Sequence, residues 1–237
     1  MNTLMSERQK QIYRAQVYEW GGMYDKMMEA IQSIITIAEF EKSELEEVEK
    51  QLLSSCIKHK VNSTRNSFRK IIEEKSIQSR TKNEMQISCC DDYLKILKRR
   101  LQTFLNSIDT IIDRFIINSD RGKLYKAKLI ADNARYRLEV DIKTCEDVKK
   151  LYEDAYKLSQ DFSDPSDALV LSVVLNFAVF LAERCNDIAR AKSIAKLACK
   201  NFDETIRKFD KLGYKSKISE ATLKTLETLK EHINTWI

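Results

Sequence analysis

The chain has 237 residues, including 4 Gly and 1 Pro, and 43% of its residues are hydrophobic. Turn-rich β folds and glycine-lined nucleotide loops need residues with positive φ, so this composition argues against all-β and nucleotide-binding α/β classes. The 41 basic and 36 acidic residues give a net charge of +5, which permits a phosphate-bearing partner without requiring one. We therefore expect an all-α protein, and no linker-like stretch divides residues 1–237 into separate domains.

Helix start signals recur along the chain. Asp164-Pro165 is an N-cap residue followed by proline at the first helical position, and Gly21-Gly22 and Gly213 are expected helix stops. Capping-box spacing is present in Ser6 with Gln9, Ser43 with Glu46, and Thr144 with Asp147. Together with a polar break at 76–82, these signals predict helices at residues 5–20, 24–39, 44–75, 83–118, 121–141, 145–161, 165–184, 187–210 and 216–236. Their short connections predict antiparallel neighbours.

The sequence lacks the residue patterns that several classes of protein function require. The 6 cysteines include no CxxC pair, so we expect buried free thiols in a reducing, cytoplasmic compartment. His59 and His232 lack metal-ligand spacing, and no GxSxG, P-loop or dinucleotide motif is present. We therefore expect no catalytic residue, metal or cofactor. Basic residues are interspersed with acids, which argues against nucleic acid, and the apolar run 168–182 is too interrupted for a membrane span.

The run 168–182 is apolar except for Ser172 and Asn176, which lie about 40° apart on a helix. Glu183 falls about 20° from Ser172 on the same face. Leu175 and Val179 flank this polar stripe. A polar stripe on an otherwise buried helix faces either internal hydrogen-bond partners or a binding groove, and both interpretations remain open.

Two further patterns offer donors to a phosphate. Lys58, Arg65 and Arg69 lie within about 40° of one another on one helix face, although a solvated charged face is the common explanation of such a stripe. Arg135 and Tyr136, one heptad after Lys128, offer a planar fork and a hydroxyl. The competing interpretation is an ordinary ion pair of Asp132 beside a packed Tyr136.

In this order, the elements resemble the 14-3-3 family of phosphoserine- and phosphothreonine-binding adaptors. The run 175–180 with Glu183 is similar to the family's LNFSVF…E signature, and 132–140 is similar to DYYRYLAEV. Residues 52–54 with Lys58, Arg65, Phe68 and Arg69 resemble LLSVAYKN…RRSSWR. Pro165 matches the start of the PTxP run, and Trp236 matches the end of LTLW. The resemblance covers residues 11–236.

The resemblance implies a cup-shaped protomer with a concave amphipathic groove that binds phosphorylated segments of client proteins and regulates signalling. The first four helices would form the dimerisation half, and the last five with the third helix would form the groove. The implied phosphate ligands are Lys58, Arg65, Arg135 and Tyr136, with Arg69 and Lys128 as auxiliary charges. The implied peptide contacts are Leu175, Asn176, Val179, Glu183 and His232.

The last helix departs from the family pattern. His232 stands where the family has an asparagine that contacts the peptide backbone, and imidazole can also donate a hydrogen bond. Lys224 and Thr228 align with groove leucines of the family, unless a one-residue slip brings Leu223 to the wall. The alternative function is therefore a degenerate helical scaffold that binds protein partners independently of phosphorylation. An enzyme acting on small molecules or nucleic acid is a third and remote hypothesis.

The dimer interface implied by the family has also changed. Met23 and Arg100 replace one ion pair of that interface, and Lys26 and Ile96 replace another. Because exposed ion pairs contribute less than about 1 kcal/mol, apolar contacts can take their place. We expect a homodimer whose interface contains Val17, Met23, Lys26, Tyr93, Ile96 and Arg100.

Overall fold

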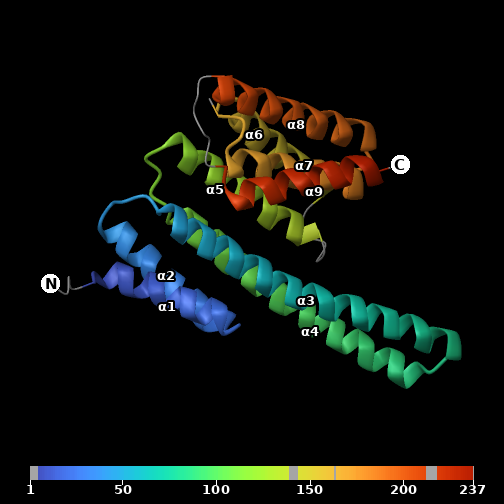
Figure 1. Ribbon diagram of the computed structural model, residues 1–237. Coiled ribbons are helices and arrows are strands. Elements are labelled where there is room, and N and C mark those ends of the chain that lie inside the picture. The colour runs from blue at the N-terminus through green and yellow to red at the C-terminus, as the bar shows by residue number, and fades with distance from the viewer. Residues whose placement is uncertain (1–4, 139–143, 163, 212–217, 237) are drawn as a thin grey trace. The chain divides into compact units, whose positions relative to one another are not determined.

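The computed structural model describes residues 5–138, 144–162, 164–211 and 218–236, and these contain nine α-helices and no strand (Figure 1). The all-α prediction is confirmed. The helices are α1 (Glu7–Trp20), α2 (Tyr24–Phe40), α3 (Glu47–Thr81), α4 (Glu84–Asp113), α5 (Asp120–Arg137), α6 (Cys145–Gln160), α7 (Ala168–Arg184), α8 (Ile188–Lys211) and α9 (Glu220–Thr235).

Two compact units divide the chain, one over residues 1–122 and the other over residues 123–237. In the first unit, α1 packs on α2, and the long helices α3 and α4 pack along each other (Figure 1). Its fully buried side chains include Met27, Ile34, Leu53, Leu101 and Leu105. Each unit thus has its own apolar interior.

The helix starts follow the capping signals at some positions and not at others. The capping boxes at Ser6 and Thr144 are confirmed. The box predicted at Ser43 is wrong, because Glu46 caps α3 and its backbone N–H donates to Glu49 Oε2 at 2.7 Å. The Ser43 hydroxyl instead accepts a hydrogen bond from Arg8.

Three other boundaries also differ from prediction. The polar stretch 76–82 does not interrupt α3, which continues to Thr81 and ends where Lys82 adopts a left-handed backbone with φ of 54°. Helix α4 ends at Asp113, before the predicted 118. Helix α7 begins at Ala168 because Asp167, rather than Asp164, accepts a hydrogen bond from a helical amide, Leu169 N–H at 2.7 Å. The predicted helix ends at 141 and at Gly213 lie outside the described residues.

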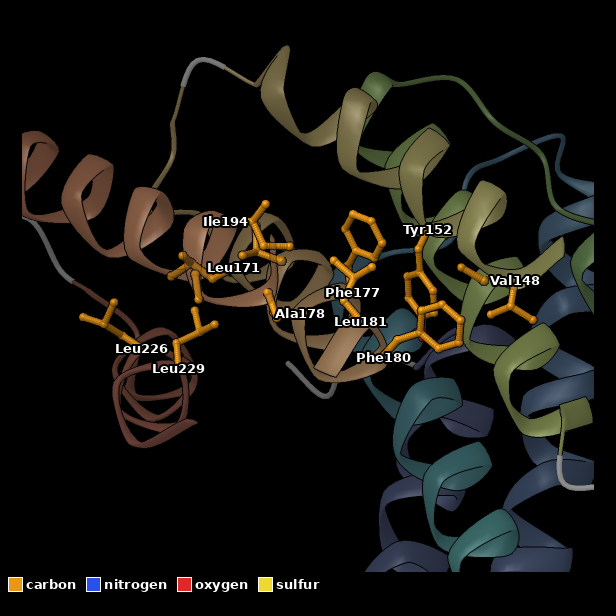
Figure 2. Close-up of a cluster of buried hydrophobic side chains, with 14 of the residues drawn as sticks. Val148, Tyr152, Leu171, Phe177, Ala178, Phe180, Leu181, Ile194, Leu226 and Leu229 are labelled. Carbon is orange, nitrogen blue, oxygen red and sulfur yellow. The ribbon is translucent and has the colours of Figure 1, made fainter. Parts of the chain in front are cut away.

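Helix α7 is the centre of the second unit. It packs against α6, α8 and α9, and Ala131 and Ala134 of α5 join the same cluster of buried side chains. Figure 2 shows the aromatic rings of α6 and α7 toward one end of this cluster, and Ile194, Leu226 and Leu229 of α8 and α9 toward the other. Because it is enclosed by these helices, α7 holds its few polar side chains in fixed positions.

The six cysteines are free thiols, as predicted, but only Cys56 is buried. Cys89 and Cys145 are exposed, so the expectation of uniformly buried thiols is wrong. Burial raises the pKa of the Cys56 thiol to about 12, which keeps it protonated and unreactive. Over the described residues, no helix has the length and apolarity needed to cross a membrane.

Candidate functional site

The predicted site residues lie in both units. Lys58, Arg65 and Arg69 lie on α3 in the first unit, where Lys58 and Arg69 are exposed and Arg65 is half-buried. The remaining candidates lie on α5, α7 and α9 in the second unit. The structure brings Lys128, Arg135 and Asn176 together around the Asp132 carboxylate of α5, and the Tyr136 ring lies against Arg135. The contribution of the three α3 cations to the same site stays a prediction.

Asp132 is the carboxylate around which the second unit's polar side chains gather. It is 7% exposed, and its Oδ2 accepts from Lys128 Nζ at 2.7 Å. Its Oδ1 accepts from the Tyr152 hydroxyl at 2.6 Å, and Asn176 Nδ2 donates to both oxygens at 2.8 and 3.0 Å. Burial alone raises the pKa of Asp132, but the positive charges of Lys128 and Arg135 outweigh burial and lower it. The carboxylate is therefore ionised and fully hydrogen-bonded.

Arg135 is held at one of its three nitrogens. Its Nε–H donates to the Tyr152 hydroxyl at 3.0 Å, and its guanidinium lies 4.7 Å from the centre of the Tyr136 ring. Within the described residues, its two terminal amino groups make no hydrogen bond. Although burial disfavours the charge, Tyr152 and Asp132 raise the pKa of Arg135 above its ordinary value. The side chain thus presents an anchored cation with two terminal donors available.

Lys128 is held in an ion pair within its own helix, and Tyr136 is packed in the interior. The ammonium of Lys128 is committed to Asp132 one turn along the helix, and both side chains are mostly buried. Tyr136 is buried as well. Both features expected of a purely structural arrangement, an Asp132 ion pair and a packed Tyr136, are therefore present beside the available donors of Arg135.

The polar stripe on α7 divides between its own helix and Asp132. Ser172 Oγ donates to the backbone oxygen of Leu169 at 2.8 Å, so its hydroxyl is satisfied locally. Asn176 gives its amide N–H groups to Asp132 and keeps its oxygen as an acceptor. An internal network is therefore present at Asn176. Leu175 and Val179 are half-buried on either side of it, and Glu183 is exposed one turn beyond Val179.

The last helix places its residues on two faces. Leu226 and Leu229 pack in the core of the second unit, whereas Leu223 and Lys224 are exposed. His232 is half-buried, and its ring stacks on Trp236 with 5.2 Å between ring centres. The imidazole therefore has a defined orientation near the end of α9.

Tyr152 is the residue of this arrangement that sequence reasoning missed. It lies on α6, it is fully buried, and it contacts Asp132 and Arg135, 20 and 17 residues earlier in the chain. A usable signal exists, because Val148, Tyr152 and Ala155 follow helical spacing on the buried face of α6. A tyrosine on such a face needs a hydrogen-bond partner in the core, and the sequence does not say which one. No group of three or more potential metal-ligating side chains occurs in the described parts of the chain.

Comparisons with known proteins identify the family. The family model described as 14-3-3 protein matches residues 14–237. The chain is 30% identical to a 14-3-3-like protein of Helianthus annuus, over 100% of this chain and 92% of the relative. It is 28% identical to 14-3-3 protein beta/alpha of Homo sapiens, over 97% of this chain and 92% of the relative. These similarities show that the chain belongs to the 14-3-3 family.

Proposed function

We propose that this protein is a non-catalytic adaptor that binds phosphoserine or phosphothreonine motifs of client proteins. Membership of the 14-3-3 family supports a phosphoprotein-binding role in general. The observation that carries the finer proposal is the state of Arg135. Its Nε is anchored on Tyr152, and its two terminal amino groups are left without a hydrogen bond in the described residues.

A phosphomonoester suits this arrangement chemically. It carries close to two negative charges at neutral pH, and its oxygens match the planar spacing of a guanidinium fork. Each charge-assisted hydrogen bond contributes about 1.5–3 kcal/mol. Tyr136 follows Arg135 as the proposed hydroxyl donor. Lys128 supports the site by neutralising Asp132, so that the nearby carboxylate does not repel the phosphate.

The contribution of α3 and the peptide contacts belong to the same proposal. Lys58 and Arg65 are proposed phosphate ligands, with Arg69 as an auxiliary charge. Lys58 and Arg69 form no ion pair with any described residue, which leaves their charges available to an anion. The proposed contacts to the rest of the peptide are the acceptor oxygen of Asn176, the apolar side chains of Leu175 and Val179, and the polar groups of Glu183 and His232.

Fluorescence anisotropy with a labelled phosphoserine peptide and its unphosphorylated twin tests this function. Because the twin lacks the dianion, it is expected to bind about a hundredfold more weakly or worse. A small library of flanking sequences supplies peptides that fit the altered α9. Equal affinity for both members of every pair would contradict the proposal and favour a scaffold that binds partners independently of phosphorylation.

We also propose that the protein is a homodimer joined through its first unit. Exposed apolar side chains occur on α1, in the turn that follows it and on α4, and exposed apolar side chains in such numbers are typical of interfaces. Tyr13 and Trp20 contact each other edge to face on α1, with 6.4 Å between ring centres. Lys26 pairs with Glu29 on its own helix at 2.8 Å, so its charge needs no partner across an interface. The exposed apolar set consists of Tyr13, Val17, Trp20, Met23, Met85, Tyr93 and Ile96, and Arg100 follows Ile96 by one turn on α4.

Charged substitutions within this set are expected to separate the protomers. The double variant Trp20→Asp with Ile96→Asp places charge on side chains that are 72% and 58% exposed in a single chain, so folding of the protomer should be retained. Sedimentation velocity should show a dimer for the wild type and a monomer for this variant. Phe40→Asp, at an aromatic that is 88% exposed on α2, is the matched control and should remain dimeric. A monomeric wild type would contradict the dimer.

A further inference from the structure

A continuous chain of hydrogen bonds crosses the second unit from Arg135 to Asn176. Arg135 Nε–H donates to the Tyr152 hydroxyl, this hydroxyl donates to Asp132 Oδ1, and Asn176 donates to the same carboxylate. We propose that Tyr152 is a positioning residue for phosphate recognition, which sets the direction of the Arg135 fork and connects it to the peptide-binding Asn176. This inference rests on the proposed function and assigns a role to a residue outside the ligand-contacting set.

The position of the Tyr152 hydroxyl is fixed by packing. The ring is fully buried and lies parallel to Phe177, with 5.8 Å between ring centres and an interplanar angle of 12° (Figure 2). Phe180 contacts the same ring at 5.2 Å. Because interiors are close-packed, the ring has no alternative place to occupy. The hydroxyl is therefore a rigid anchor for whatever it binds.

The chemistry of the three groups fixes the direction of both hydrogen bonds. Ionised Asp132 can only accept, and the guanidinium of Arg135 can only donate. The group between them must therefore donate to one and accept from the other, which a neutral hydroxyl does. Burial and the negative charge of Asp132 raise the pKa of Tyr152 well above its ordinary value, so the hydroxyl keeps its proton.

The hydroxyl also separates Arg135 from Asp132. Without it, the guanidinium and the carboxylate would attract each other directly, and Asp132 would bind the terminal amino groups that a phosphate needs. The fork would then point toward the interior. Tyr152 thus keeps the cation near Asp132, whose negative charge compensates the burial of the guanidinium, and leaves both terminal amino groups for the ligand.

Replacement of Tyr152 by phenylalanine removes the hydroxyl and keeps the ring. With the phosphoserine peptide of the anisotropy assay, Tyr152→Phe is expected to bind about tenfold more weakly, as the loss of one oriented hydrogen bond predicts. Affinity for the unphosphorylated twin should not change. Tyr156→Phe is the matched control, because Tyr156 lies one turn later on α6 and packs on Phe177 without a hydrogen bond from its hydroxyl to described residues. The control should bind like the wild type.

A double-substitution cycle separates positioning from a general structural effect. In an Arg135→Ala background, Tyr152→Phe should cause no further loss, because the group that it orients is absent. The same loss in both backgrounds would overturn the proposal, as would wild-type affinity in Tyr152→Phe. These results leave the proposed function standing, provided that the wild type prefers the phosphopeptide. If the wild-type protein does not prefer the phosphopeptide, both the proposed function and the positioning role of Tyr152 are overturned.

A measurement on the unaltered protein does not depend on how the variant folds. In the wild type, the Arg135 Nε–H is expected to exchange with solvent more slowly than that of exposed Arg69, because it donates to a buried hydroxyl. Nitrogen-15 NMR can follow both signals, with Arg135→Lys and Arg69→Lys identifying them. Equally fast exchange would overturn the role of Tyr152.

Discussion

Arg135→Ala is expected to weaken binding of a phosphoserine peptide by about a hundredfold or more, which corresponds to losing two charge-assisted hydrogen bonds. The terminal amino groups of Arg135 make no hydrogen bond to the described residues, and its Nε–H donates to the Tyr152 hydroxyl. Anisotropy titration of both proteins with the same labelled peptide measures the effect. Binding of the unphosphorylated twin should be almost unaffected, because it contains no group for the fork.

One further variant distinguishes the effect of the planar guanidinium of Arg135 from that of its positive charge, and a second serves as a control. Arg135→Lys keeps the positive charge but loses the planar pair of donors, so its affinity should fall between those of the wild type and Arg135→Ala. Arg190→Ala is the control, since Arg190 pairs with Glu153 at 2.8 Å in the same unit, outside the proposed site. If Arg135→Ala bound the phosphopeptide as tightly as Arg190→Ala, the phosphate would not be recognised at α5.

Local sequence signals predicted the helices well where a single side chain decides the boundary. The capping boxes at Ser6 and Thr144 are examples, since each bond joins residues within one turn. The start of α7 was misplaced because two aspartates compete for the cap. Asp164 accepts from Ser166 N–H at 2.9 Å in a preceding turn, and Asp167 caps the helix. The deciding factor is the path of the loop, which composition does not specify.

The candidate site shows the same division between local and tertiary information. Asn176 stands out in the sequence because it interrupts an apolar helix, and Arg135 stands out through the resemblance to a known motif. No local sequence pattern identifies the role of Tyr152, because its hydroxyl finds its hydrogen-bond partners only after α6 has packed beside α5 and α7. Contacts across 20 and 44 residues create the Asp132 network. Sequence reasoning therefore found the ends of the network and missed the residue that joins them.

The Asp132 network also gives a stabilising role to residues that serve binding. Lys128 and Arg135 are cations in a largely buried setting, and both depend on one carboxylate. Removing one partner of such a group leaves the remaining charges without compensation, and that loss commonly exceeds what the intact pair contributes. The hydrogen-bond network that orients the Arg135 guanidinium therefore also stabilises the fold.

Asp132→Asn is accordingly expected to lower the free energy of unfolding by about 3–5 kcal/mol, although the side chain keeps its size. The amide cannot neutralise Lys128, and its N–H group would oppose the donors that now surround the carboxylate. Urea titration followed by circular dichroism measures the loss. Asp154→Asn is the control, because Asp154 pairs with Lys157 at 3.9 Å on the exposed face of α6. Its effect should stay within about 1 kcal/mol.

The pH dependence of this difference identifies its electrostatic origin. The pKa of Asp132 is lower in the folded protein than its ordinary value, so the unfolded chain takes up a proton first as the pH falls. The stabilisation from the carboxylate is therefore complete above the unfolded pKa of about 3.9 and is lost as the pH falls through the folded value. The gap between wild type and Asp132→Asn should stay constant from about pH 5 to 8 and shrink below about pH 4. A gap that is the same at acidic and neutral pH would assign the loss to packing instead of charge.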